Sequence, residues 1–373
     1  MISSPIEIKS MIRKVLITLF LLLLVVIVAA FVAYRYYMSE HVIIDFIKKN
    51  PNRAAIYWTQ NGKVMADLRS DVKFPLASTV KIIIAIEFAK QVAAQKINPK
   101  EQIAIADLDV FYLPDTDGGA HEEWKKLLKQ SNLIQNNAVP LEEVAKGMIR
   151  FSSNANTEYL MMRLGLDNIN ANLDSLGLKQ HDRLYPIVSA LLVLSNEKGI
   201  SDEAFLAQTK NLSSSDYVQK CFEIHEKLKN DRDGSLKKAF VFPNMDLQKV
   251  WSDRLPASTT REYVSIISKI NSRTYFPDVA QRQLDNMMEW VFEDIPKKRE
   301  QFEHLGMKGG STAFVLTNTL YATSSNGKNE IAYFFNDLTD DEASKLQWST
   351  IVFNGKCLKS TTCDEVANKL MEK

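Results

Sequence analysis

The longest uninterrupted apolar stretch of the chain lies close to its N-terminus. Residues 15–34 read VLITLFLLLLVVIVAAFVAY and contain no charged side chain. A helix of this length rises about 30 Å, enough to cross the hydrocarbon core of a bilayer. Three cationic residues precede it and only Arg35 follows closely. The positive-inside bias therefore predicts a cytoplasmic segment at 1–14, a single transmembrane signal anchor at 15–34 and a domain on the extracytoplasmic, or periplasmic, side. A cleaved signal peptide is the alternative, although its apolar region is normally shorter.

Beyond the anchor, some segments show the alternating apolar pattern of strands, and others show the spacing of apolar residues that is typical of helices. Residues 54–59 and 63–68 flank Asn61-Gly62, a sequence typical of a tight hairpin turn. Ser78 opens the run STVKIIIAIEFAKQVAAQ, which is apolar on nearly every face of a helix and so predicts a central buried helix. Further helices are predicted at residues 41–49, 122–130, 141–150, 156–164, 259–270 and near 363–371.

The C-terminal part alternates again, which indicates strands. Strands are predicted at 312–322 and 330–336, on either side of a turn at 325–328. Residues 107–121 are rich in Asp, Gly and Pro and predict a loop, whereas the polar stretch 197–236 is expected to be an insertion of helices and loops. Strands at both ends with helices between them predict an α+β domain over residues 40–373, with one antiparallel sheet built from both ends of the chain.

Composition and motif content exclude several classes of function. The chain has 46 Lys and Arg residues against 45 Asp and Glu residues, so no basic surface for nucleic acid is expected. It has neither a His-Glu-x-x-His nor a Cys-x-x-Cys motif, and no metal or other cofactor is expected. Cys357 and Cys363 could close a small disulfide loop, but two free thiols are an equal alternative because spacing does not show geometry. Cys221 would then be single.

Ser78-Thr79-Val80-Lys81 is the strongest candidate for chemistry. The Ser-x-x-Lys spacing alone is weak, because it also begins at Ser70, Ser195, Ser235 and Ser325. Ser78, however, opens the most apolar helix, where the helix dipole stabilises an alkoxide, and Lys81 lies one turn later on the same face. Burial lowers the pKa of a lysine, so that it can accept a proton. The alternative is an N-cap serine with a solvated lysine.

Two later segments strengthen this interpretation. Ser152-Ser153-Asn154 lies just before a predicted helix, and Lys308-Gly309-Gly310-Ser311 lies just before a predicted strand. With Phe74-Pro75-Leu76-Ala77-Ser78-Thr79-Val80-Lys81, and in this order, they resemble the S-x-x-K, S-D-N and K-T-G elements of the penicillin-recognising serine hydrolases, which are the class A β-lactamases and the penicillin-binding D,D-peptidases. The resemblance implies a bacterial protein, a β-lactamase-like fold with an all-helical part over residues 40–373, and a β-lactam or D-Ala-D-Ala-type peptide substrate.

The resemblance also implies roles for individual residues. Ser78 would attack an amide carbonyl, and Lys81 would take its proton. Ser152 would pass that proton to the leaving nitrogen, and Lys308 would supply positive charge near the substrate carboxylate. Tyr112 is a candidate for stacking on the substrate, with a plain surface loop as the alternative. The remaining implied residues are Asn154, Gly310, Ser311 and Thr312 in substrate binding and the backbone N–H groups of Ser78 and Ser311 in an oxyanion hole.

Departures from the family pattern put turnover in doubt. Gly309 stands where the family has Thr or Ser, and Ser153 stands where class A has Asp. Residues 181–186 resemble the Ω-loop, with Tyr185 at the place of the glutamate that activates water for deacylation. This favours a D,D-peptidase or a slow acyl acceptor over a β-lactamase. The alternative is a degenerate scaffold that binds cell-wall peptide or a protein partner. Possible substitutes for the glutamate are Glu122, Glu123 and Glu158.

Overall fold

The computed structural model describes residues 13–14, 16–28, 31, 38–197 and 199–372. Residues 16–28 are helical, and their large apolar side chains are exposed. Within the described ranges, no helix is both long and apolar enough to cross a membrane. Residues 15, 29–30 and 32–34 of the predicted anchor, and most of the segment predicted to be cytoplasmic, lie outside these ranges. The predicted transmembrane helix therefore has no support from the structure.

A five-stranded antiparallel sheet joins the two ends of the domain, in the order β2-β1-β9-β8-β7. The strands are β1 (Ala54–Gln60), β2 (Lys63–Leu68), β7 (His304–Ser311), β8 (Leu316–Ser324) and β9 (Gly327–Phe335). β1 pairs with β9, which brings the N-terminal hairpin against the C-terminal strands. The hairpin turn at Asn61-Gly62 has positive φ at both residues, the conformation that this pair favours.

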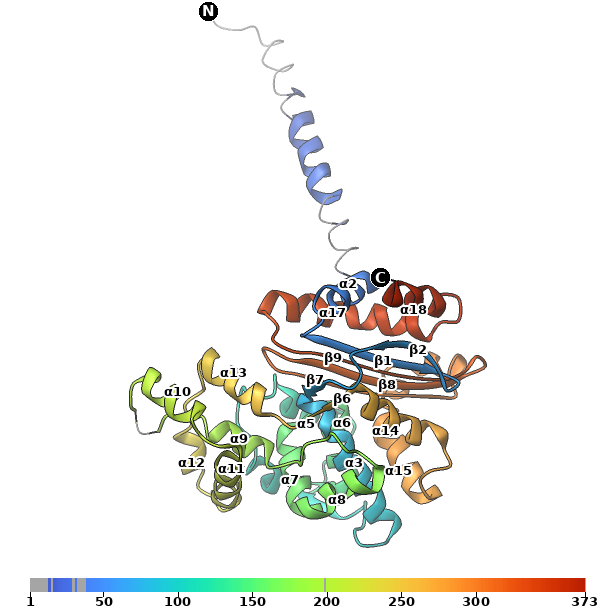
Figure 1. Cartoon of the computed structure of the whole chain (residues 1–373). Helices are drawn as coiled ribbons and strands as arrows, with labels where there is room; N and C mark the ends of the chain where they lie inside the picture. The colour runs from blue at the N-terminus through green and yellow to red at the C-terminus, as the bar shows by residue number, and fades with distance from the viewer. Residues whose placement is uncertain (1–12, 15, 29–30, 32–37, 198, 373) are drawn as a thin grey trace, which may run out of the picture.

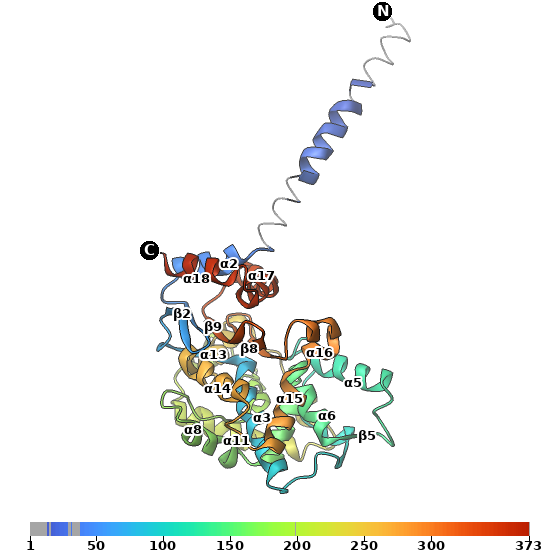
Figure 2. The same ribbon diagram turned by 90° about the vertical axis from the view of Figure 1, so that its right-hand side faces the viewer.

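Helices cover both faces of the sheet (Figures 1 and 2). On one face lie α2 (Glu40–Lys49), α17 (Asp340–Leu358) and α18 (Cys363–Met371), which share a buried apolar cluster with the sheet. On the other face α14 (Thr260–Ser272) contacts β1, β8 and β9. Because both faces are covered, β8 is buried over seven consecutive residues instead of at alternate ones.

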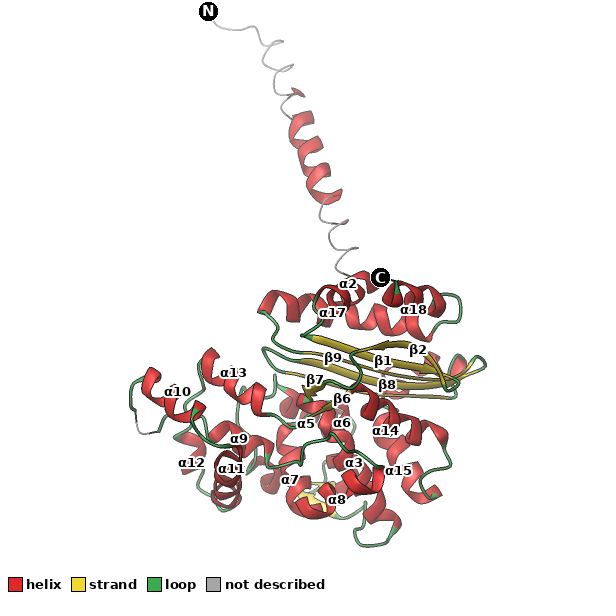
Figure 3. Cartoon of the chain, in the orientation of Figure 1, coloured by secondary structure: helices red, strands yellow, loops and turns green. Residues whose placement is uncertain are grey.

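The helical part is built around α3 (Lys81–Ala93), in which every residue except Lys90 and Ala93 is buried. Its apolar residues pack against α6 (Leu141–Arg150), α7 (Asn154–Leu164), α8 (Leu166–Leu176) and α15 (Asp278–Met288). This placement agrees with the all-round apolar pattern of the run. The predicted α+β architecture, with one antiparallel sheet built from both ends of the chain and a helical part between them, is confirmed (Figure 3).

Shorter elements complete the domain. Two small antiparallel pairs connect loops, and a 3-10 turn precedes α3. These elements are β3 (Lys73–Pro75) with β6 (Ala257–Thr259), β4 (Gln102–Ala104) with β5 (Ala138–Pro140), η1 (Ala77–Val80), α4 (Ile105–Asp109), α5 (Ala120–Gln130), α9 (Ile187–Leu192), α10 (Asp202–Lys210), α11 (Ser214–Lys229), α12 (Ser235–Lys238), α13 (Met245–Arg254), α16 (Val291–Asp294) and η2 (Pro296–Glu300).

The structure corrects the bounds of one predicted strand and shows the state of the cysteines. The strand predicted at 312–322 is wrong in its bounds, because residues 312–315 form the turn between β7 and β8. A hydrogen bond from the Thr312 N–H to the Val315 carbonyl closes this turn. The segment Lys308–Ser311 consequently forms the end of β7, and this turn separates it from β8. Cys221, Cys357 and Cys363 are all buried free thiols in the structure.

Candidate active site

Ser78 sits on a sharp turn that is fixed to the sheet. The chain leaves β3 and enters η1 through Ala77, whose φ of 45° is unfavourable for a residue with a side chain. The Leu76 carbonyl accepts the Thr79 N–H at 3.1 Å and the Thr317 hydroxyl at 2.8 Å. The hydroxyls of Thr79 and Thr317 lie 2.7 Å apart. These contacts hold the turn against β8 and position Ser78 at the mouth of α3.

Lys81 is wholly buried, and its amine is surrounded by acceptors. Its Nζ donates to the Ser152 carbonyl at 2.6 Å and to Asn154 Oδ1 at 2.9 Å, and it lies 3.2 Å from Ser152 Oγ. Burial lowers the pKa of Lys81 well below its ordinary value, and the charge of Lys308 lowers it further, while Asp117 opposes this change. A neutral amine has two N–H donors and one lone pair. The carbonyl and the amide oxygen take the donors, so the lone pair is left for a hydroxyl.

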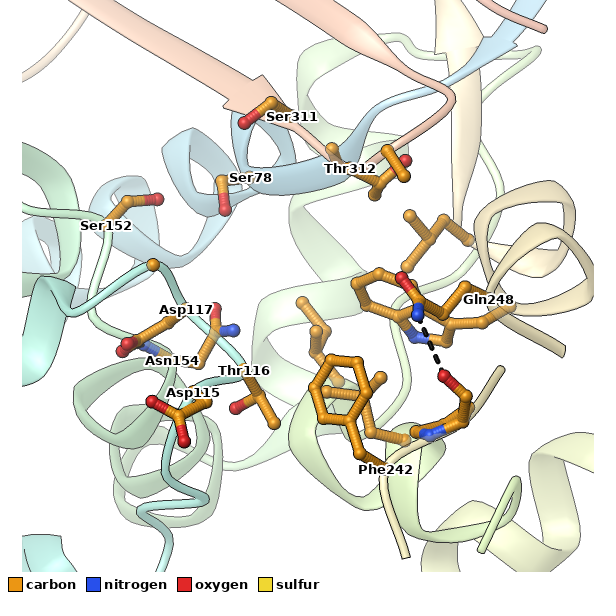
Figure 4. A pocket seen from close by; sticks show the side chains of 18 of the residues that line it. Ser78, Asp115, Thr116, Asp117, Ser152, Asn154, Phe242, Gln248, Ser311 and Thr312 are labelled. Atoms are coloured by element: carbon orange, nitrogen blue, oxygen red, sulfur yellow. Dashed lines mark hydrogen bonds between the residues drawn. The ribbon is translucent and has the colours of Figure 1, made fainter. Parts of the chain in front are cut away.

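The Ser152 hydroxyl lies between two lysines. Lys308 reaches it from β7, and its Nζ donates to Ser152 Oγ at 3.0 Å and to the Gly309 carbonyl at 2.6 Å. Burial lowers the pKa of Lys308 to about 7. Ser152 itself has a φ of 69°, a strained conformation for a serine that projects its hydroxyl toward Ser78 (Figure 4). This arrangement allows a proton to pass between an amine and a substrate atom through the hydroxyl.

The glycines of β7 allow the strand to approach the turn that carries Ser78. A Cβ on Gly310 would lie 2.5 Å from the Ser78 nitrogen and 2.7 Å from the Thr79 nitrogen, so only glycine fits there. A Cβ on Gly309 would meet nothing closer than the Thr317 carbonyl at 3.4 Å. The close contact brings Ser78 and Ser311 together at one end of the same pocket (Figure 4).

The pocket beside Ser78 has a volume of about 480 Å³, the size of sites that bind small molecules. Ser152, Asn154 and Asp117 lie along one wall, and Phe242 and Gln248 lie along the opposite wall (Figure 4). The structure thus brings Ser78, Ser152, Asn154, Ser311 and Thr312 to one pocket, with Lys81 and Lys308 bonded to Ser152.

Comparison with known proteins identifies the family. The family model described as the beta-lactamase enzyme family matches residues 39–271, which is more than half of the chain. The chain belongs to the beta-lactamase enzyme family. No curated protein sequence matches the chain.

Solved structures share the fold of this beta-lactamase family protein. A β-lactamase from Chitinophaga pinensis is similar at 14% identity and a TM-score of 0.52, over 84% of this chain and 97% of that one. A β-lactamase from Sphaerobacter thermophilus has 16% identity and a TM-score of 0.51, over 82% and 90%. The structure of PBP-A has 16% identity and a TM-score of 0.50, over 85% and 94%. The resemblance to penicillin-recognising serine hydrolases is confirmed.

In this beta-lactamase family protein, Tyr112 is not among the residues that line the pocket. Its ring packs against His121, with ring centroids 4.8 Å apart, and the Lys125 amine lies 5.5 Å from the ring centroid. The geometry therefore gives no support for stacking of Tyr112 on a substrate. Thr312 does line the pocket, and its hydroxyl accepts a bond of 2.8 Å from the Ser252 hydroxyl.

Tyr185 does not occupy a position from which it could act on an acyl ester at Ser78. Its ring is buried against Tyr217, Cys221 and Leu247, and its hydroxyl donates to the Arg254 carbonyl. It lines a separate cavity and not the pocket of Ser78. Packing of the loop onto α11 and α13, which the local sequence does not show, turns the side chain away.

The glutamates considered as substitutes also lie elsewhere. Glu122 and Glu123 are exposed in the first turn of α5. Glu158 is fully buried and accepts bonds from the Val188 N–H at 3.0 Å and the Ser189 hydroxyl at 2.6 Å. None of the three lines the pocket. Glu158 instead ties α7 to α9, which is a structural role.

Two carboxylates that were not predicted from the sequence, those of Asp115 and Asp117, also line the pocket. Asp117 Oδ2 accepts the backbone N–H of His121 at 3.2 Å and that of Asn154 at 3.4 Å. The Asp-rich loop was visible as a pattern, but its composition does not show which carboxylates turn inward.

A second contact fixes the same loop to α7. Ser153 Oγ lies 2.9 Å from His121 Nδ1 and accepts the Asn156 N–H, while His121 Nε2 lies 2.9 Å from Asp109 Oδ1. Both Ser153 and His121 are fully buried. Ser153, at the position where class A has an aspartate, thus links His121 to the N-terminus of α7 and holds that N-terminus in place. In the part of the chain that the structure describes, no group of three or more His, Cys, Asp or Glu side chains is placed to hold a metal ion.

Proposed function

We propose that the protein is an active serine acyl hydrolase of the β-lactamase and penicillin-binding type, in which Ser78 forms an acyl-enzyme with a β-lactam or a D-Ala-D-Ala-type amide. The observation that carries the proposal is the surroundings of Lys81. Its amine is fully buried and contacts two acceptors that carry no proton, the Ser152 carbonyl and Asn154 Oδ1, together with the Ser152 hydroxyl. An uncharged amine of this kind beside a serine hydroxyl is an activated nucleophile pair.

The proposed reaction uses the residues around the pocket in turn. The Ser78 hydroxyl loses its proton to Lys81 as Oγ attacks the amide carbonyl carbon. The C–N bond then breaks, and the leaving nitrogen receives a proton through the Ser152 hydroxyl, which both lysines contact. Backbone N–H groups of Ser78 and Ser311 stabilise the oxyanion, a contribution of about 3–4 kcal/mol per donor in serine hydrolases. Lys308 attracts the substrate carboxylate, and Asn154 binds the substrate amide.

We expect the acyl-enzyme to be long-lived. Efficient hydrolysis of the ester needs a base that activates water. Tyr185 faces away from the pocket, and Glu122, Glu123 and Glu158 lie outside its lining. The carboxylates that do line it are Asp115 and Asp117, and the hydrogen bonds of Asp117 go to backbone N–H groups and not to Ser78. This arrangement supports a D,D-peptidase or a slow acyl acceptor over a fast β-lactamase.

We also propose that residues 15–34 anchor the protein in a bacterial cell membrane, with the catalytic domain on the periplasmic side. The support is the uncharged apolar stretch and its flanking cationic residues. In cells, full-length protein should stay in the membrane fraction after an alkaline wash, and a chain lacking residues 1–38 should be soluble. Recovery of both forms as soluble protein would contradict the anchor.

Labelling with a fluorescent penicillin tests the catalytic proposal. Wild-type protein should carry a covalent fluorescent band on a denaturing gel, and Ser78→Ala should abolish it. Ser325→Ala is the matched control, because Ser325 also begins a Ser-x-x-Lys sequence but lies exposed in the turn before β9. Absence of labelling in folded wild-type protein at millimolar penicillin would instead favour a scaffold that binds cell-wall peptide or a partner without turnover.

A further inference from the structure

The pocket beside Ser78 has an unusual charge pattern on its surface. Asp115 and Asp117 both line it, and the lining contains no Lys or Arg side chain within the described residues. Lys81 and Lys308 are buried, and their amines contact the Ser152 hydroxyl without lining the pocket themselves. A substrate that enters therefore meets two carboxylates along the wall that also carries Asn154 (Figure 4).

Asp115 is free to interact with a ligand. Its side chain is exposed, and among the residues that the structure describes it has no hydrogen bond or ion pair. Its backbone has a φ of 62°, which projects the side chain from a turn of the loop before α5. Asp117 is partly buried, and only its Oδ2 is hydrogen-bonded, to the N–H groups of His121 and Asn154, while Oδ1 has no partner. The two carboxylates together make this wall electronegative.

The opposite wall is apolar. Phe242 is 51% exposed and faces the carboxylate wall across the pocket (Figure 4). The Gln248 amide holds its loop by a bond of 2.8 Å to the Pro243 carbonyl. The other apolar lining residues on α9, on α13 and after it are Ile187, Leu191, Trp251 and Leu255.

We propose that this pocket selects acyl donors that carry an ammonium group next to an aromatic or apolar group, with Asp115 as the residue that determines the specificity. The proposal rests on the proposed acylation of Ser78. The apolar group would be buried against Phe242 and Trp251, which removes apolar surface from water. The ammonium group would lie beside the carboxylate of Asp115. The substrate class is thus an amine-bearing amide, such as a peptide with a free side-chain amine or an aminopenicillin.

Three penicillins of matched shape test the proposal. Benzylpenicillin, ampicillin and carbenicillin share one phenyl ring and differ only in the α-substituent of the side chain, which is hydrogen, ammonium or carboxylate. Second-order rate constants for acylation of the full-length protein should be highest for ampicillin and lowest for carbenicillin, by roughly three- to tenfold at each step for one partly screened charge. The assay pH must keep the ampicillin amine protonated.

The variants separate the specificity from the chemistry. Asp115→Asn should bring the three rate constants together, mainly by slowing ampicillin and speeding carbenicillin. Asp174→Asn, which removes an exposed carboxylate on α8 outside this pocket, should leave the order unchanged. Raising the ionic strength from about 0.01 M to about 1 M shortens the Debye length from roughly 30 Å to 3 Å and should also reduce the preference.

The possible failures are distinguishable. If none of the three penicillins acylates Ser78, the proposed function fails, and the specificity proposal fails with it. If all three acylate Ser78 at equal rates, or if Asp115→Asn leaves the order unchanged, the proposed function stands and the selection of ammonium-bearing substrates by Asp115 is overturned.

Discussion

The side-chain nitrogen of Lys308 donates a hydrogen bond of 3.0 Å to the hydroxyl of Ser152. This bond connects the last part of β7 with the segment just before α7, which is 156 residues earlier in the chain. Since Lys81 Nζ lies 3.2 Å from the same oxygen, one hydroxyl is shared by two buried amines. Like charges at this separation disfavour each other, so the pair favours one charged and one neutral lysine. Burial and the charge of Lys308 both lower the pKa of Lys81, whereas burial alone lowers the pKa of Lys308, which favours Lys81 as the neutral one.

Removing the Lys81 amine should stop acylation without unfolding the protein. Lys81→Met keeps a side chain of similar length and should slow acylation by about 10²- to 10⁴-fold, the usual contribution of a general base. Two acceptors lose their donor, but a buried amine is also removed, so the melting temperature should change by only a few degrees. Lys90→Met is the matched control, because Lys90 is the exposed lysine of the same helix. Acylation by Lys81→Met at the wild-type rate would contradict the role.

Acylation by anionic substrates should decline above neutral pH. Burial lowers the pKa of Lys308 to about 7, so its positive charge is lost as the pH rises through that value. The rate constant for acylation by benzylpenicillin should therefore fall on the alkaline side with an apparent pKa near 7 in the free enzyme. Lys308→Arg keeps the charge and should move this decline to higher pH. A profile that is flat from pH 6 to pH 9 would show that the charge of Lys308 is not used.

The same lysine should make stability depend on pH. Its pKa is about 7 in the folded state, against an ordinary value of 10.5 in the unfolded chain, so between these values the unfolded state binds more protons. The free energy of unfolding should therefore rise with pH across this window, at up to about 1.4 kcal/mol per pH unit from one group. Denaturant titrations of Lys308→Met at several pH values should show a smaller slope than those of the wild type. An unchanged slope would contradict the lowered pKa.

The approach of β7 to the turn that carries Ser78 predicts a contrast between adjacent glycines. Gly310→Ala would place a methyl group 2.5 Å from the Ser78 nitrogen and must displace the turn. Acylation should fall by about 100-fold or more, the effect of losing an oxyanion donor. Gly309→Ala would meet only the Thr317 carbonyl at 3.4 Å and should keep acylation within about threefold of the wild type. Equal effects of the two substitutions, measured by penicillin labelling rates, would contradict the close approach.

Tyr185 should matter for stability and not for turnover. Tyr185→Phe loses the bond to the Arg254 carbonyl and should lower the free energy of unfolding by about 0.5–1.5 kcal/mol, with acylation and deacylation unchanged. Tyr185→Glu would bury a carboxylate against Tyr217 and Cys221 and should destabilise the protein further. Urea titration and release of bound penicillin check these outcomes. Faster release from Tyr185→Glu would show that residue 185 reaches the ester.

The local spacing of apolar residues and the turn residues were sufficient to predict several helices and the N-terminal hairpin. The helices at Leu141–Arg150 and Cys363–Met371 and the Asn61-Gly62 hairpin have the predicted positions. β7 was missed because Gly309 and Gly310 are poor strand formers. Gly310 is required there by its contact with Ser78, a residue far away in sequence, and no local pattern can show that contact.

The residues of the site that belong to sequence motifs were also predictable, but the directions of other side chains were not. Ser78, Ser152 and Lys308 were found from three ordered motifs, and the structure brings them together. The side-chain directions of Tyr112 and Tyr185 were not predictable, because packing against other helices decides them. Asp115 was also missed, since its place in the pocket depends on how the loop before α5 folds onto α7.

Peptide mapping of a penicillin-treated sample shows whether Ser78 is the residue that is acylated. The full-length protein is incubated with benzylpenicillin, digested at low pH and analysed by mass spectrometry. We expect a mass increase of one penicillin on the peptide that contains Ser78, with fragment ions that assign it to Ser78, and no such peptide from Lys81→Met at the same time point. An adduct on any other residue, or an unmodified Ser78 peptide in folded protein at millimolar penicillin, would contradict it.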